Sequence, residues 1–104
     1  MVERSDSRPQ TFALQQNYPN PFNSGTVIRF ALRAREEVEL AVFNLAGQQV
    51  ATLVEGVRGA GAYTINWDGL DDRGQALASG LYLYRLRAGG GGEQVETRKL
   101  VLVR

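Results

Sequence analysis

The acidic loop at residues 68–74 is the stretch whose residue types most directly suggest chemistry. It reads Asp68-Gly69-Leu70-Asp71-Asp72-Arg73-Gly74, and closely spaced carboxylates are the oxygen ligands that Ca²⁺ prefers. The spacing does not match an EF-hand loop, however, and no glutamate closes it. Aspartates in glycine-rich turns commonly accept hydrogen bonds from their own backbone. We therefore favour a structural turn over a calcium site.

Aromatic side chains offer a second kind of chemistry, because flat rings can stack on sugars. The candidates are Tyr63, Trp67, Tyr82 and Tyr84. All four fall in phase with aliphatic neighbours, which predicts that they point into the core. Phe43 is the one aromatic residue out of phase with the inward set of its strand. A carbohydrate-binding module is therefore the least favoured of the candidate functions.

Composition excludes several classes of enzyme. The 104 residues include no histidine and no cysteine, so a Ser-His triad, a thiolate zinc site and a disulfide are impossible. A glycosidase would need two carboxylates with one of them desolvated, whereas most of the 11 acidic residues fall on outward strand positions or turns. We predict that the domain is not an enzyme.

Charge and hydropathy bear on partners and location. With 12 basic and 11 acidic residues, the net charge of +1 gives no electrostatic basis for binding nucleic acid or an anionic membrane. No apolar run approaches the roughly 20 residues of a membrane span, so no membrane insertion is expected. Residues 1–6 contain no signal-peptide core, so an exported protein would carry its signal upstream.

Apolar alternation with a period of two predicts the elements that position these residues. Six or seven short strands separated by turns, without helical periodicity, predict an all-β sandwich with antiparallel neighbours. Val50 and Leu53 break the alternation of their strand, which indicates a β-bulge. Residues 1–10 have linker composition, and 11–104 form the domain. The expected strands are 11–16, 26–32, 37–44, 49–54, 62–67, 81–88 and 94–104, with glycine-rich loops at 55–61 and 89–92.

Residues 17–23 form a stiff segment before the first long strand. The order Asn17-Tyr18-Pro19-Asn20-Pro21-Phe22-Asn23 contains two X-Pro bonds, and proline cannot donate to a strand ladder. This composition excludes a central strand. We expect Tyr18 and Phe22 to be anchored in apolar surface.

The last strand has apolar side chains at both sets of alternating positions, so both of its faces are apolar. Its sequence is Arg98-Lys99-Leu100-Val101-Leu102-Val103-Arg104, and Leu81 and Leu83 are outward positions on its expected hairpin partner. Such a stripe suits a docking face, and an edge strand can also add to a partner's sheet. The alternative, favoured by pattern alone, is a strand covered on both faces or ordinary scattered surface residues.

Five ordered blocks resemble the type A C-terminal sorting domains of the type IX secretion system. They are the 17–23 segment with Thr26-Val27-Ile28-Arg29-Phe30, the stretch 42–50, Trp67-Asp68-Gly69, the stretch 78–86 and the closing 98–104. The immunoglobulin-like domain of the flagellar hook-capping protein is related. It shares the Trp-Asp-Gly and Gly-x-Tyr blocks, but the Asn-Pro-Phe opening less strongly. Ser24-Gly25 stands where the sorting family often has Pro-Ser, a loop change that leaves the fold intact.

The resemblance implies an immunoglobulin-like antiparallel β-sandwich of about seven strands. It also implies a module that sends a larger exported protein through the periplasm to the cell surface. The outer-membrane translocon would recognise the closing strand, and in many members a sortase removes the domain and attaches the upstream cargo to surface lipopolysaccharide. Cleavage is then expected within residues 1–16. A structural spacer or cap domain is the alternative. The implied recognition residues are Lys99, Leu100, Val101, Leu102, Val103 and Arg104, and the implied structural residues are Tyr18, Pro19, Asn20, Pro21, Phe22, Trp67, Asp68, Gly69, Gly80 and Tyr82.

Overall fold

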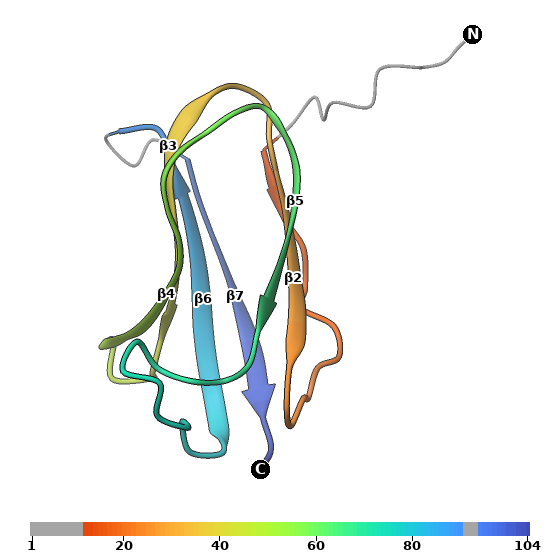
Figure 1. Cartoon of the computed structure of the whole chain (residues 1–104), viewed down its shortest axis with the longest axis vertical. Helices are drawn as coiled ribbons and strands as arrows, with labels where there is room; N and C mark the ends of the chain where they lie inside the picture. The colour runs from red at the N-terminus through yellow and green to blue at the C-terminus, as the bar shows by residue number, and fades with distance from the viewer. Residues whose placement is uncertain (1–11, 91–93) are drawn as a thin grey trace, which may run out of the picture.

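Seven antiparallel strands in two sheets make up the computed structural model, which describes residues 12–90 and 94–104 (Figure 1). The predicted β-sandwich is therefore confirmed. Within the described residues no helix has the length and apolar character needed to cross a membrane. The predicted linker at 1–10 lies outside the described part of the chain. The strands are β1 (Ala13–Leu14), β2 (Thr26–Leu32), β3 (Glu36–Phe43), β4 (Gln49–Arg58), β5 (Gly61–Trp67), β6 (Gly80–Ala88) and β7 (Gln94–Leu102).

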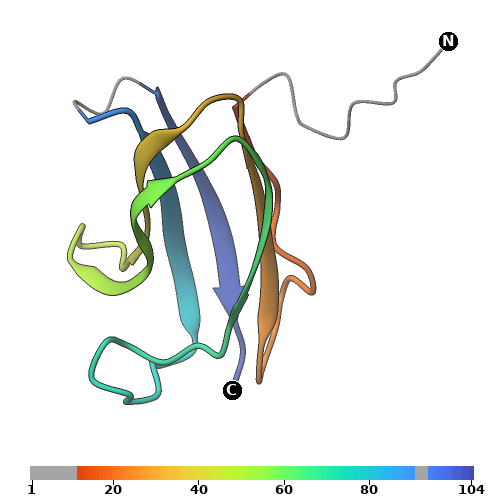
Figure 2. The same cartoon turned by 45° about the horizontal axis from the view of Figure 1, so that its top comes forward.

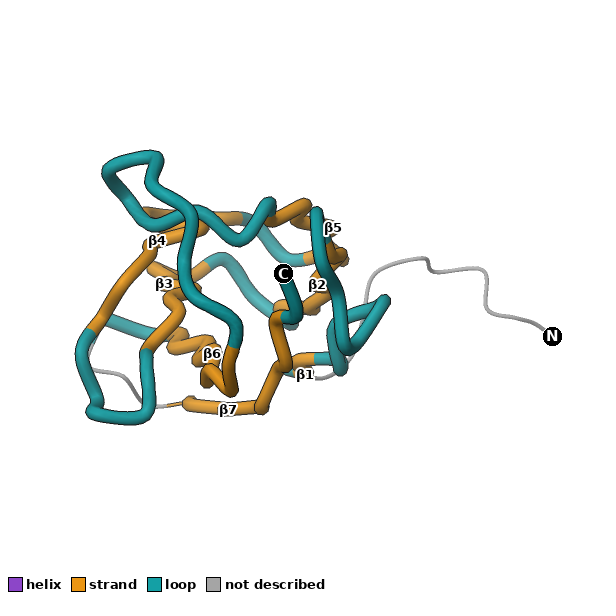
Figure 3. Tube along the Cα trace, turned by 90° about the horizontal axis from the view of Figure 1, so that it is seen from below, coloured by secondary structure: helices purple, strands orange, loops and turns teal. Residues whose placement is uncertain are grey.

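The two sheets have the strand orders β1-β2-β5 and β4-β3-β6-β7. The two sheets face each other across the sandwich (Figure 2). Seen along the strands, β1 lies near β7 at one side of the sandwich, while β4 and β5 lie at the other (Figure 3). β1 is tied to β7 by side chains: the Leu14 N–H donates to Glu96 Oε1 at 2.7 Å, and Arg98 Nε donates to the Leu14 carbonyl at 2.6 Å. The hairpin predicted between the last two strands is confirmed.

The core consists of the inward positions that the period-two alternation predicted. Burying each large apolar side chain contributes roughly 1.5–3 kcal/mol to stability. Tyr63 and Ile65 on β5 are only partly buried against this core. The larger buried residues are Leu14, Phe22, Ile28, Phe30, Leu32, Val38, Leu40, Val42, Val54, Trp67, Tyr82, Tyr84, Leu86, Leu100 and Leu102.

β4 confirms one expectation and corrects another. Its register against β3 shifts twice, and the residues left without a partner are Leu53 and Val50, the two that broke the alternation. The predicted loop at 55–61 is wrong, because residues 55–58 continue β4 and pair with residues 36–39 of β3. Gly56 adopts a φ of 117° inside this strand, so its glycine signals an irregular strand rather than a loop.

The chain ends also differ from the predicted ranges. The first strand contains only Ala13 and Leu14. After Leu14 the chain makes only isolated backbone hydrogen bonds to β2, from Gln15 to Arg29 and between Tyr18 and Val27, so the ladder does not continue. The last strand ends at Leu102 rather than at residue 104. Val103 and Arg104 instead bond to loop residues.

A buried polar cluster fixes the 17–23 segment onto the four-stranded sheet. The Tyr84 hydroxyl accepts a 2.8 Å hydrogen bond from the Asn17 N–H and donates a 2.7 Å bond to the Gln15 carbonyl. Asn17 is 2% exposed, and its Nδ2 donates to Thr26 Oγ1 and to the Pro19 carbonyl. Burial raises the pKa of the Tyr84 phenol above its ordinary value. The Asn17 hydrogen bond and the nearby Arg98 charge lower it by less.

Replacing Tyr84 by phenylalanine is expected to cost about 1–3 kcal/mol of unfolding free energy, because a buried N–H and a carbonyl lose their partner. Tyr82→Phe is the matched control, since the Tyr82 hydroxyl makes a single 2.7 Å bond to the Ala78 carbonyl and its loss should be smaller. Urea unfolding at pH 7 measures both changes. Equal losses would contradict the role assigned to the Asn17 contact.

The raised pKa of Tyr84 also predicts a pH dependence. The phenol of an unfolded tyrosine loses its proton near pH 10. At that pH the Tyr84 phenol of the folded protein still holds its proton, because its pKa is raised. The unfolded state therefore binds fewer protons above this pH, and stability falls as pH rises from about 10 through the folded pKa. The Tyr84→Phe variant should show a shallower alkaline loss over that range.

Candidate docking surface

The 17–23 segment lies along the outer edge of β7 instead of standing apart from it. The Phe22 N–H donates to the Val101 carbonyl at 3.0 Å, and the Val103 N–H donates to the Phe22 carbonyl at 2.8 Å. Asn20 Oδ1 accepts from the Val101 N–H at 2.9 Å. Gln16 Nε2 donates to the Lys99 carbonyl at 2.7 Å. Backbone groups on the edge of β7 between residues 99 and 103 are thus already hydrogen-bonded within the chain. A partner's strand could not pair with the edge of β7 at these groups.

Phe22 and Tyr18 lie in opposite environments, so the expectation that both are anchored is only half right. Phe22 is buried and packs on Trp67 with ring centroids 5.7 Å apart. Tyr18 is 75% exposed. Its N–H and carbonyl both bond to Val27, and successive side chains of an extended chain point to opposite faces. Since Asn17 takes the inward place, Tyr18 points outward.

The outer face of the four-stranded sheet carries an apolar patch, which we call the outer patch and define as Phe43, Leu81, Leu83 and Val101. Leu81 pairs with Val101 across β6 and β7, and Phe43 pairs with Leu83 across β3 and β6. Leu81 is 37% exposed and the other three are partly exposed. The predicted docking residues Leu81 and Leu83 therefore adjoin outward side chains of the closing strand.

Basic side chains border the outer patch. The Arg85 guanidinium lies over the Phe43 ring, 4.5 Å from its centroid. Arg85 also approaches Glu39 at 3.9 Å, and Lys99 is the cross-strand partner of Leu83. A cation over an aromatic face at this distance is stabilising. The surface combines exposed aliphatic area with positive charge.

The six predicted recognition residues divide by the face they occupy. Leu100 and Leu102 are 0% exposed and belong to the core. Lys99 and Val103 are exposed, and Val101 is partly exposed. The closing strand is therefore buried on one face and available to a partner through alternate side chains on the other.

Arg104 ties two loops together at the end of the sandwich, the connection 15–25 before β2 and the loop 68–79 before β6. Its guanidinium donates to the carbonyls of Leu77, Asn23 and Gly69 at 3.0, 3.2 and 2.8 Å. Its backbone N–H donates to Ser79 Oγ at 2.8 Å. The family resemblance implied a recognition role for Arg104, whereas its contacts in the structure hold neighbouring loops in place.

Gly69 has a conformation that this clamp requires. Its φ is +78°, and a Cβ added there would lie 2.9 Å from Arg104 Nη2. Gly69→Ala is expected to cost more than the roughly 1–2 kcal/mol of a left-handed alanine, because the Arg104 contacts are also displaced. Gly47→Ala is the matched control, with a φ of +84° and nothing within 4 Å. Thermal unfolding of both variants checks this, and equal losses would contradict the clamp.

The acidic loop is the predicted structural turn. Asp68 Oδ1 accepts from the Leu70 N–H, Asp71 Oδ1 accepts from Arg73 and Gln75, and Asp72 Oδ1 accepts from the Thr52 N–H of β4. Each aspartate is thus used by backbone donors. Across residues 12–90 and 94–104, no group of three or more acidic, histidine or cysteine side chains is placed to hold a metal ion.

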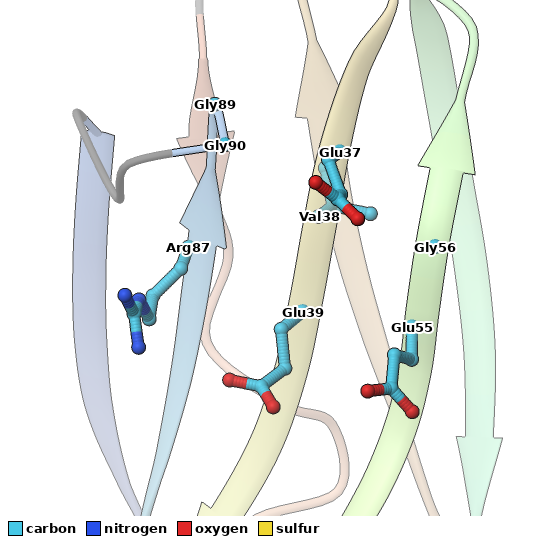
Figure 4. Close-up of a pocket in the computed structure, with 8 residues that line it drawn as sticks. All are labelled: Glu37, Val38, Glu39, Glu55, Gly56, Arg87, Gly89 and Gly90. Atoms are coloured by element: carbon cyan, nitrogen blue, oxygen red, sulfur yellow. The ribbon is translucent and has the colours of Figure 1, made fainter.

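An open hollow of about 270 Å³ lies over the other end of the same sheet face (Figure 4). Glu39 and Glu55 stand side by side on β3 and β4, with Glu37 and Arg87 beside them. Glu37, Glu55 and Arg87 are exposed to solvent. A glycosidase requires a desolvated carboxylic acid, and this open sheet face does not desolvate one. The cluster is better described as a solvated, mixed-charge surface.

The proposed sugar platform is not assembled. Trp67, Tyr82 and Tyr84 are buried, and Trp67 Nε1 donates to the Leu70 carbonyl at 3.0 Å. Tyr63 is partly buried and stacks on Phe30 with centroids 5.1 Å apart. Their inward phase is confirmed, and the residues named for the platform do not form an exposed coplanar set.

Two features of this surface were missed in the sequence. Asn17 and Gln16 connect the 17–23 segment to β6 and β7, and Arg104 clamps the loops. Each involves a polar side chain and a backbone group far away in sequence. A weak signal existed at Asn17, since a polar residue before a rigid proline segment needs partners if it is buried.

The two antiparallel sheets and their shared core define an immunoglobulin-like domain. The family model described as the FlgD Ig-like domain matches residues 16–92, and the chain belongs to this family. A comparison with curated proteins gives no match.

Two solved structures from Porphyromonas gingivalis share the fold at 19% sequence identity. Dimeric latent PorU matches with a TM-score of 0.72 over 89% of this chain. PorZ, an essential bacterial surface component of the type-IX secretion system, matches with a TM-score of 0.57 over 96% of this chain. The chain spans only 9% of PorU and 13% of PorZ. The likeness at this identity concerns the fold.

Proposed function

We propose that the domain is a non-enzymatic sorting module that directs a larger exported protein through the type IX secretion system to the cell surface. The observation that carries the proposal is the two-sided closing strand, with Leu100 and Leu102 in the core and Val101 beside Leu81 on the outer face. The ordered sequence blocks support it. The shared fold with PorZ, itself described as a component of that system, is compatible with it.

In this proposal the outer-membrane translocon binds the outer face of β7. Lys99, Val101 and Val103 supply the contacts, while Leu100 and Leu102 hold the strand in register. A sortase cleaves N-terminal to the sandwich, within residues 1–16, and the upstream cargo remains at the surface. Identifying the C-terminal residue of a processed cargo by mass spectrometry tests the cleavage position, and an end inside the sandwich contradicts it.

A structural spacer or cap is the second candidate. The observation that favours it is membership of the FlgD Ig-like family. A spacer needs only a stable sandwich with attachment points, so it predicts that outer-patch substitutions leave the function of the parent protein unchanged. Sorting predicts the opposite.

A transport assay distinguishes the two candidates. A periplasmic reporter is fused upstream of residues 11–104 in a host carrying the type IX system, with a twin carrying Leu81→Glu and Val101→Glu. Val95→Glu is the matched control, because Val95 is 48% exposed and faces Arg87 rather than the outer patch. Sorting predicts surface delivery of the parent and control fusions, and periplasmic retention of the twin as a soluble protein. Retention of all three favours the spacer.

A further inference from the structure

We propose that a second copy of this chain pairs with β5, edge to edge and antiparallel about Thr64, so that two three-stranded sheets join into one. The pairing would occur on the side of the sandwich opposite the covered edge of β7 and is independent of the sorting role. The proposal rests on three properties of β5: outward backbone groups without a partner in the described part of the chain, a sequence without charge, and a register in which two copies of the strand complement each other.

The edges of the two sheets are protected to different degrees. β7 is covered along residues 99–103 by Gln16 and the 17–23 segment. The first half of β4 is covered by Asp72, which accepts from the Thr52 N–H and donates its own N–H to the Val50 carbonyl. The second half of β4 carries Glu55 and Arg58, and charged residues on an edge discourage pairing. β1 has only two residues.

β5 has none of these protections. Its sequence, Gly-Ala-Tyr-Thr-Ile-Asn-Trp, contains no charge and no proline. Its register with β2 runs without a shift from Gly61 to Trp67, so no bulge twists the edge away. An uncharged and regular edge of seven residues is a template for another strand.

The bonding of β2 shows which groups of β5 face outward. The backbone of Val27 bonds to Tyr18 and the carbonyl of Arg29 bonds to Gln15, both on the far side of β2. Backbone groups alternate along a strand, so Ile28 and Phe30 bond to Ile65 and Tyr63 on β5. The groups of Ala62, Thr64 and Asn66 therefore point to the free edge. In the described part of the chain no loop or side chain hydrogen-bonds to them there.

The strand is complementary to itself when a twofold axis passes through Thr64. Thr64 then faces Thr64 of the second copy, and Ala62 faces Asn66, so all outward backbone groups bond. On the inner face Tyr63 meets Ile65, an aromatic and β-branched pair that is favourable across antiparallel strands. Both residues are only partly buried in the single chain, so pairing would cover them further.

The charge nearest the end of β5 does not oppose this arrangement. Asp68 directly follows β5 and is exposed. With the axis at Thr64, Asp68 faces Ala60 of the second copy, so the register places no like charges opposite each other within the strand or directly beside it.

Cysteine crosslinking of the full chain tests both pairing and register, since the natural sequence has no cysteine. Facing residues of a hydrogen-bonded antiparallel pair lie about 5.5 Å apart at Cα, within disulfide range. Thr64→Cys is expected to form a disulfide-linked dimer on mild oxidation. Ala62→Cys alone should not, but it should crosslink when mixed with Asn66→Cys. All three positions are exposed, so accessibility is matched.

Sedimentation equilibrium of the unmodified chain is expected to show a mass rising with concentration above 11.4 kDa. Thr64→Lys, which opposes two like charges at the axis, should abolish this rise, whereas Thr97→Lys on the outer face of β7 should not. A chain that remains monomeric throughout overturns the proposal. So does self-crosslinking of Ala62→Cys as fast as that of Thr64→Cys.

Discussion

Replacement of Trp67 by alanine is expected to lower the free energy of unfolding by about 3–5 kcal/mol, the range for removing a large aromatic from a core. Trp67 is 4% exposed, packs on Phe22 and donates a hydrogen bond to Leu70. The change therefore leaves a cavity under the 17–23 segment and an unpaired carbonyl at the acidic turn. Urea unfolding followed by circular dichroism measures the loss.

Tyr18→Ala is the control, because it also removes an aromatic ring but from a side chain that is 75% exposed. Its effect should stay within about 0.5 kcal/mol, as for ordinary surface substitutions. A cost below about 1 kcal/mol for Trp67→Ala would mean that the indole does not close the core. The carbohydrate-binding interpretation would then regain support.

Period-two alternation predicted the fold well because most strands bury one face. In β6, Tyr82, Tyr84 and Leu86 are buried while Arg85 and Arg87 face outward, as the pattern indicated. Even the failure of alternation was informative, since Val50 and Leu53 proved to be the two bulged residues. Each of these inferences depends only on local geometry, which the sequence carries directly.

The errors arose where distant partners decide the outcome. Residues 55–58 looked like part of a loop because the stretch 55–61 contains three glycines, but pairing with β3 keeps them in a strand. Tyr18 looked like an anchor, but Asn17 beside it takes the inward position through its bond to Tyr84, 67 residues away. The recognition role implied for Arg104 stays a prediction, and the structure adds three hydrogen bonds from its guanidinium to carbonyls of two loops. Such side-chain to backbone bonds leave no periodic signal.

The candidate docking surface combines both kinds of information. The sequence predicted outward Leu81 and Leu83 and a closing strand that is apolar on both alternations. The structure adds Phe43 with its Arg85 partner, and it removes Leu100 and Leu102 from contact with any partner by burying them. Tests of recognition therefore need substitutions at outward positions rather than deletion of the strand.

Leu102→Ala and Val101→Ala should separate the two faces of the closing strand. Leu102 is 0% exposed, so its truncation is expected to cost about 2–5 kcal/mol by leaving a cavity beside Phe22 and Gly69. Val101 is partly exposed on the outer face, and its truncation should cost less than about 1 kcal/mol. Guanidinium unfolding of both variants measures the difference.

The pair also bears on the transport assay. Removal of residues 99–104 deletes Leu100 and Leu102 from the core, so a truncated fusion would fail by unfolding whether or not the strand is recognised. If Val101→Ala proved as destabilising as Leu102→Ala, the outer face would be packed rather than free, and the docking proposal would lose its basis. A stable Val101→Ala fusion with reduced export would instead assign the loss to recognition.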